Sequence, residues 1–169
     1  MGTAMEIQSI TFTASVPVNM GCYALDFSMS FAHTDVDQLS ETFEMNYTPG
    51  SLIEVFQTDS LVLDQIEGET LVLELDTPFF YNGQDNLLID IYYPSGYLYY
   101  SVWCWTAGSN RSLSRMFAPY SDFKDRLETG NLFEDLPWMI IEGDLGLDET
   151  TFGRIKVMLG SYKGRAENE

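Results

Sequence analysis

Apolar and polar side chains alternate along much of this chain, which is the pattern of a half-buried β-strand. One run has large apolar residues at alternate positions, with small or polar residues between them: Tyr23, Leu25, Phe27, Met29 and Phe31. Leu71 to Leu75 repeats the pattern with Val72 and Glu74 between the leucines. These alternations predict strands whose odd-numbered side chains face a core.

Short apolar runs elsewhere predict further strands, because pairs of turn-forming residues separate them. The runs are Ile7 to Phe12, Leu52 to Phe56, Leu87 to Tyr93, Leu98 to Trp105, Leu113 to Phe117 and Trp138 to Ile141. The turn pairs are Pro49-Gly50, Glu67-Gly68, Asn82-Gly83 and Ser95-Gly96. Helical signals are sparse, the best being Asp122 to Glu128. The pattern therefore predicts an all-β fold: an antiparallel β-sandwich, jelly-roll-like, with at most one short helix.

The chain has the size of one domain, and we expect residues 1–143 to form the sandwich. Residues 144–160 then read as a linker followed by a terminal β segment, and residues 161–169 as a polar tail. Thr151 to Leu159 is expected to be a last strand of the same sheet or, as the alternative, a strand that pairs with another subunit.

The charge of the chain limits its partners. Its 26 acidic and 8 basic residues give a formal net charge of -18 at pH 7, with 45% hydrophobic residues to form a core. Such a field repels phosphate backbones and anionic headgroups, so nucleic acid and membrane surfaces are not expected as partners. No apolar run is long enough to cross a bilayer, and residues 1–6 do not resemble a signal peptide.

One segment, Asp76 to Ile91, contains the run Thr-Pro-Phe-Phe-Tyr-Asn-Gly-Gln-Asp-Asn-Leu-Leu. It resembles a motif of accessory β-sandwich domains, adhesin-like in type, in secreted and surface-anchored bacterial proteins. Phe31 to Leu39 and Thr150 to Lys156 resemble other parts of such domains more weakly. The resemblance implies an extracellular or cell-surface location and a non-catalytic structural or adhesive role. Other protein subunits or domains, including further copies of the chain, are then the expected partners.

The motif also has a purely structural interpretation. Asn82-Gly83 predicts a turn with a positive φ, and the side chains of Asp85 or Asn86 are expected to bond backbone groups before the buried run begins. We therefore interpret the motif as a folding signature rather than as a site formed by Asn82, Asp85 or Asn86.

The segment Tyr92 to Trp105 is rich in aromatic residues, and the parity of its predicted loop decides which of them face the core. An even loop centred on Ser95-Gly96 places an aromatic platform on the outer face beside Asp90: Tyr92, Tyr97, Tyr99, Trp103 and Trp105. Such a surface packs against another protein or, as an alternative function, stacks on sugar rings. The competing interpretation is that a loop, such as Pro119 to Leu136, covers this face as a second small core.

Catalytic and metal-binding patterns are weak. The single histidine, His33, has no nucleophile motif beside it, so we expect a loop histidine and no enzyme. No cofactor is expected, with calcium as the one possibility, at Asp35 and Asp37. Solvated acidic loops are the simpler explanation of these residues. Cys22 and Cys104 could form a disulfide or remain thiols.

Overall fold

The computed structural model covers the whole chain. The structure is described here for residues 4–13, 23–62, 70–97, 105–107, 115–118, 128–133, 135–137, 139–145 and 155–160. These residues form almost entirely β-structure, and the predicted all-β sandwich is confirmed. The one helical element among them is a 3₁₀ turn, η1 (Phe43–Asn46).

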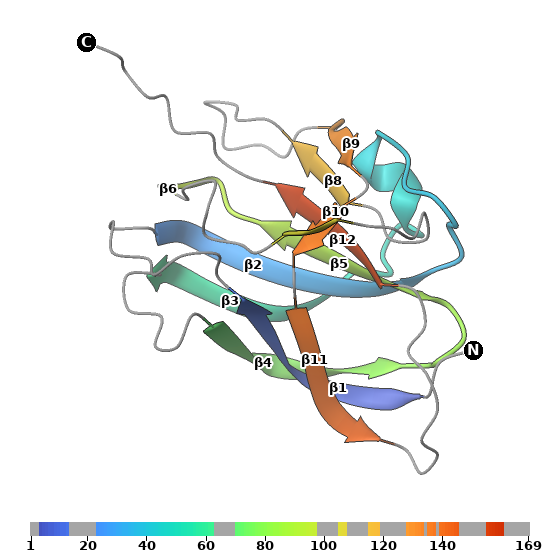
Figure 1. Cartoon of the computed structure of the whole chain (residues 1–169), viewed down its shortest axis with the longest axis horizontal. Coiled ribbons are helices and arrows are strands. Elements are labelled where there is room, and N and C mark those ends of the chain that lie inside the picture. The colour runs from blue at the N-terminus through green and yellow to red at the C-terminus, as the bar shows by residue number, and fades with distance from the viewer. Residues whose placement is uncertain are drawn as a thin grey trace.

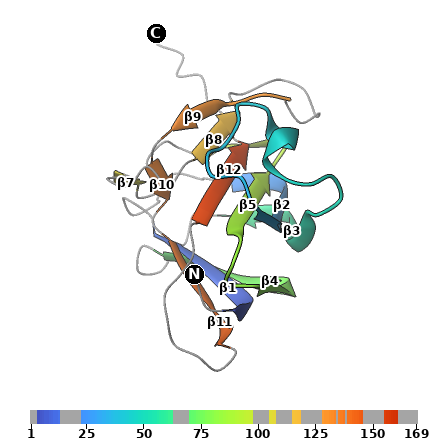
Figure 2. The same cartoon turned by 90° about the vertical axis from the view of Figure 1, so that its right-hand side faces the viewer.

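Two sheets pack face to face (Figures 1 and 2). The small sheet has the strand order β11-β1-β4, formed by β1 (Met5–Thr13), β4 (Thr70–Tyr81) and β11 (Met139–Leu145). The large sheet has the order β3-β2-β5-β12-β8-β9, with β6 also paired to β2. Its strands are β2 (Tyr23–Thr34), β3 (Ile53–Val62), β5 (Asn86–Tyr92), β6 (Ser95–Tyr97), β8 (Arg115–Ala118), β9 (Asn131–Phe133) and β12 (Ile155–Gly160).

A two-stranded sheet of β7 (Trp105–Ala107) and β10 (Asp135–Pro137) lies at the side of the sandwich away from β3 (Figure 2). The chain thus passes from β9 at one edge of the large sheet through β10 to β11 at the edge of the small sheet.

Most neighbouring strands are antiparallel, but β12 runs parallel to both of its neighbours, β5 and β8. It therefore lies inside the large sheet of its own chain and joins the β2-β5 part to the β8-β9 part. A jelly-roll order is not established by this arrangement and stays a prediction.

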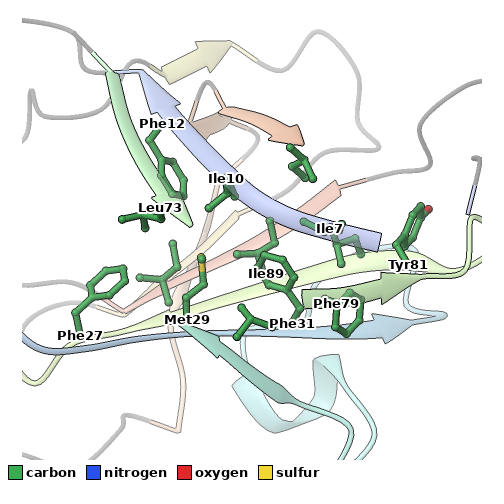
Figure 3. Close-up of a cluster of buried hydrophobic side chains, with 14 of the residues drawn as sticks. Ile7, Ile10, Phe12, Phe27, Met29, Phe31, Leu73, Phe79, Tyr81 and Ile89 are labelled. Carbon is green, nitrogen blue, oxygen red and sulfur yellow. The ribbon is translucent and has the colours of Figure 1, made fainter. Parts of the chain in front are cut away.

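The main core lies between the sheets, where the inward faces of β1, β2, β4 and β5 meet (Figure 3). Ile7 and Ile10 from β1 contact the layer formed by Met29, Phe31 and Ile89, all with no more than trace exposure. Phe31 packs edge-on against Phe79, with ring centroids 5.5 Å apart. These side chains explain the period-two pattern of the sequence, because alternate residues of a regular strand segment lie in this layer.

Two irregularities shape the small sheet. The register between β1 and both of its neighbours shifts between Ile7 and Ser9, so Gln8 forms a bulge. Ile7 of β1 pairs with Phe79 of β4, but Ser9 of β1 pairs with Glu74 of β4. Strand β4 therefore bends at the segment that contains Pro78. Proline lacks the N–H that a ladder needs, and an edge strand tolerates it for that reason.

The predicted hairpin at Pro94-Ser95-Gly96 is wrong. Ser28 of β2 pairs with Tyr92 of β5, and Leu25 of β2 pairs with Ser95 of β6. The step of three residues along β2 thus matches a step of three residues from β5 to β6. β5 and β6 therefore follow β2 in one unbroken register, and the chain does not turn back at Gly96. The remainder of the predicted return strand, Leu98 to Cys104, lies outside the described residues.

Candidate binding face

The outer face of the large sheet, turned away from the small sheet, carries exposed apolar residues at one end. Three cross-strand rows define it: Gln57, Ser28 and Tyr92; Ser60, Leu25 and Ser95; Val62, Tyr23 and Tyr97. We call the residues Tyr23, Leu25, Ser28, Gln57, Val62 and Tyr92 the open face. Tyr23 is 40% exposed, Leu25 37% and Val62 60%. The open face thus combines apolar surface with an amide and a hydroxyl group.

One left-handed residue in β2 creates this face. Asp26 has a φ of 49°, in the left-handed region, while Phe27, Met29 and Phe31 beyond it face the core. Ala24 on the other side of Asp26 is also in the core, so Tyr23 and Leu25 lie outward. The predicted alternation from Tyr23 to Phe31 is therefore wrong for its first two residues, because the alternation shifts by one position at Asp26 while the register with the neighbouring strands continues unbroken there.

The opposite end of the same outer face is covered. Ala32, Leu88 and Met116 are fully buried there against Leu39, with Phe43, Tyr47 and Leu52 packed around them. Backbone bonds hold the covering segment in place, since Phe43 N–H donates to the Glu128 carbonyl and Gly130 N–H to the Glu41 carbonyl. A second small core therefore exists at this end, and residues between Leu39 and Leu52 are part of its cover. The predicted cover of the aromatic face, Pro119 to Leu136, lies largely outside the described residues.

The structure brings only part of the predicted aromatic platform together. Tyr92 is half-buried on the open face, and the backbone of Tyr97 pairs with Tyr23 in the next rows. Trp105 is not on this sheet, because β7 pairs with β10 through Trp105 and Pro137. Tyr99 and Trp103 lie outside the described residues. Tyr23, Leu25 and Val62 complete the face instead. The regular alternation of the sequence does not mark them, although aspartate is a residue type that tolerates positive φ.

Asp90 is not part of an exposed surface, which corrects the prediction. It is 2% exposed, between Ser30 on β2 and Met158 on β12 in the strand ladder. The physical reason is that β5 lies in the middle of the large sheet and is buried on both faces from Leu87 to Ile91. The sequence of such a central strand is usually a continuous apolar run, and in β5 Asp90 interrupts that run.

The motif around residue 80 forms a hydrogen-bonded corner between the two sheets. Asn82 Oδ1 accepts from the N–H groups of Gln84 and Asp85, and Asn82 Nδ2 donates to Asp85 Oδ2 at 2.7 Å. Gly83 has a φ of 70°. Asn86 Nδ2 donates to the Val36 carbonyl at 3.0 Å. The positive φ of Gly83 and the bond from Asn86 to a backbone carbonyl agree with the predicted turn. The interpretation of the motif as a folding signature rather than a site stays a prediction.

His33 belongs to the same corner and lies on β2, not in a loop as predicted. Its Nε2 accepts a hydrogen bond from Asn82 N–H at 3.1 Å, and its ring lies 5.1 Å from that of Phe79. A neutral imidazole with the proton on Nδ1 makes this bond, since a protonated Nε2 cannot accept. The histidine therefore has a structural partner.

Tyr81 closes the corner beside the core. Its hydroxyl donates to the Asp85 carbonyl at 2.8 Å. Burial of the ring, and secondarily the negative charge of Asp85, raise the pKa of Tyr81 above its ordinary value. Both causes act in the same direction because each disfavours the phenolate.

Asp35 and Asp37, the predicted calcium residues, are both exposed in the loop that follows β2. Within the described ranges, no group of three or more His, Cys, Asp or Glu side chains is placed to hold a metal ion. Calcium binding stays a prediction. Cys22 and Cys104 fall outside the described residues. In that same described part of the chain, no helix is long and apolar enough to cross a membrane.

Comparison with known proteins adds no relative. No family model matches the chain, and neither the curated proteins nor the solved structures include a match to it.

Proposed function

We propose that this chain is a non-catalytic module that binds a partner protein through the open face and acts outside the cell, in adhesion or surface assembly. One observation carries the proposal: Tyr23, Leu25 and Val62 are exposed in adjacent rows of a regular sheet. Exposed apolar side chains gathered on one face mark interaction surfaces, and tyrosine is enriched at such surfaces.

The position of the face supports this role. The sheet beneath it is fixed by the core, where Phe27 and Met29 alternate with the outward residues of β2. Phe27 stacks on Tyr93 with centroids 6.4 Å apart, directly under this end of the sheet. A rigid base holds the face in its binding geometry before the partner arrives, which lowers the entropy cost of binding.

A second candidate is carbohydrate binding. It is favoured by the row in which Tyr92 lies beside Ser28 and Gln57, because an aromatic ring next to an amide and a hydroxyl suits a sugar ring and its hydroxyl groups.

Site-specific photocrosslinking tests the protein-binding proposal. A benzophenone amino acid at position 25 should yield one discrete protein adduct on the producing cells, and Tyr23→Ala should weaken that adduct at least about fivefold. The matched control carries the crosslinker at position 45, because Met45 is exposed but lies on η1, away from the open face. Equal adducts from the two positions, or none from position 25, would count against the proposal.

A glycan array decides the second candidate. Binding of any glycan that is lost in both Tyr23→Ala and Tyr92→Ala, but kept in Met45→Ser, would favour sugar recognition over protein binding. Absence of binding to every glycan would remove it.

A further inference from the structure

The outer face of the small sheet is a second surface, independent of the open face. Cross-strand pairing through β1 arranges it in rows: Val72, Thr11 and Ile140; Glu74, Ser9 and Glu142; Phe80, Glu6 and Asp144. Val72, Phe80 and Ile140 each leave half or more of their surface exposed. The face therefore shows large apolar side chains at both ends and carboxylates between and beside them.

The central strand of this face is buried and the strands beside it carry exposed acids. Thr11 and Ser9 on β1 are buried, whereas Glu74 and Glu142 on the flanking strands are exposed. Since neighbouring strands lie about 4.8 Å apart, the two glutamates stand about 10 Å from each other across β1. Glu142 and Asp144 are about 7 Å apart along β11. Such spacing lets separate cationic side chains reach separate carboxylates.

The charge of this face is not balanced by bases of its own strands. All eight Lys and Arg residues of the chain lie between Arg111 and Arg165, and none of them is on β1, β4 or β11. The acids on the face do have short-range polar contacts, since Gln8 Nε2 donates to Asp144 Oδ2 at 2.9 Å and Ser9 Oγ to Glu142 Oε2 at 3.4 Å. These neutral donors orient the carboxylates but leave their charge in place.

We propose that this face, which we call the acidic face (Glu6, Val72, Glu74, Phe80, Ile140, Glu142 and Asp144), docks a basic segment of a partner protein. That segment presents lysine or arginine to the carboxylates and apolar side chains to Val72, Ile140 and Phe80. Charge complementarity favours this occupant, because the carboxylates attract a basic partner and determine how its segment aligns on the face.

A second copy of the chain is a poor occupant by the same argument. Two chains of net charge -18 repel each other as they approach, which disfavours a second copy as the occupant. The occupant is therefore a different, basic protein.

Binding of a synthetic peptide to the full chain tests the inference. The probe is a blocked peptide with the repeat Val-Ser-Lys-Ser, whose extended form presents valine and lysine on one side. Controls are the repeats Val-Ser-Glu-Ser and Ser-Ser-Lys-Ser. Isothermal titration at low salt should detect the probe, and both controls should bind at least about tenfold more weakly. Raising the ionic strength should weaken the probe's binding, because exposed charge pairs are screened beyond about 10 Å at 0.1 M salt.

Paired variants locate the binding. Glu74→Gln with Glu142→Gln keeps the shape and the acceptor for Ser9 but removes two charges, and it should raise the Kd about fivefold or more. Glu41→Gln with Glu44→Gln removes the same charge from exposed residues around η1, and it should leave the Kd within about twofold. Val72→Ser with Ile140→Ser should weaken binding as the first pair does.

Three results would overturn the inference. The first is an equal rise in Kd for the two glutamate pairs, which indicates attraction to net charge alone. The second is that the probe does not bind at low salt. The third is a concentration-dependent dimer of the chain that dissociates in the Val72→Ser and Ile140→Ser variant. None of these outcomes depends on the open face, so the inference and the proposed function fail separately.

Discussion

The backbone angle of Asp26 decides which side chains of β2 reach solvent. Its positive φ places Ala24 in the core and turns Tyr23 and Leu25 outward. The sequence pattern alone favours the opposite result, since alternation from Tyr23 to Phe31 is regular. An aspartate in a strand is ordinary as an exposed residue, so the pattern contains no clear sign that this one adopts a left-handed conformation.

Substitution of Asp26 should separate the backbone from the side chain. Asp26→Gly keeps the left-handed conformation without steric cost, whereas Asp26→Val meets the penalty of a β-branched residue at positive φ. We expect the valine variant to be less stable than the glycine variant by about 1 to 2 kcal/mol in urea unfolding. Equal stabilities would mean that the strand does not need the left-handed residue.

Tyr81 should make stability depend on pH in the alkaline range. The folded chain holds the pKa of this phenol above its ordinary value of 10.0, so the neutral form is favoured in the fold. Its contribution is fully present below about pH 10 and is lost as the pH rises through the raised pKa. The stability difference between the natural chain and Tyr81→Phe should therefore shrink as the pH rises above about 10. A difference that stays constant over this range would show that Tyr81 is not the titrating group.

Most strands of the two sheets were predictable, whereas their irregular ends were not. Runs that the sequence marks as strands overlap with β1, β2, β3, β4, β5, β8, β11 and β12. The sequence predicts a turn at β6, because Pro94 and Gly96 are turn formers. Gly96 instead pairs with β2 at close range, and a Cβ there would collide with the Tyr23 carbonyl and Ala24 Cα. Glycine serves equally for a turn and for close backbone approach, so its presence could not decide between them.

Gly143 provides the test of such an approach in the small sheet. A Cβ at this position would overlap the Glu6 carbonyl oxygen on β1, a backbone atom that a rotamer change cannot move. Gly143→Ala should therefore lower the free energy of unfolding by about 1 to 3 kcal/mol and speed amide exchange along β1. Gly50→Ala is the comparison, because it has a positive φ but no atom within 4 Å of the added carbon. It should lose stability without faster exchange in β1, and increased β1 exchange in both variants would contradict a local clash.

The whole molecule is divided electrostatically along its sequence. The first 110 residues contain no Lys or Arg, and they supply the described parts of β1 to β6. Composition indicates this acidity at once, but only the fold shows that exposed acids gather on the outer face of the small sheet. The candidate site was less predictable than the fold, because the open face depends on one residue at positive φ and on pairings between residues far apart in the chain.

Salt should stabilise the protein. Repulsion within a chain of net charge -18 destabilises the compact state, and added ions screen it. We expect the melting temperature to rise by roughly 2 to 4 °C between about 0.02 and 0.3 M sodium chloride, equivalent to about 1 kcal/mol. The rise should level off above that range, where screening is nearly complete. A flat or falling melting temperature would show that the acids are already compensated locally.

The central place of β12 has a consequence for how the protein is made. Synthesis proceeds from the N-terminus, so β5 and β8 leave the ribosome well before the strand that joins them. Until β12 follows, the large sheet consists of two separate pieces, each with an unpaired edge on a strand that will be internal. During that interval these edges are the positions most prone to pair with another nascent chain. Folding of the large sheet is therefore a late event, and the time between synthesis of β8 and β12 is when a chaperone would be most useful.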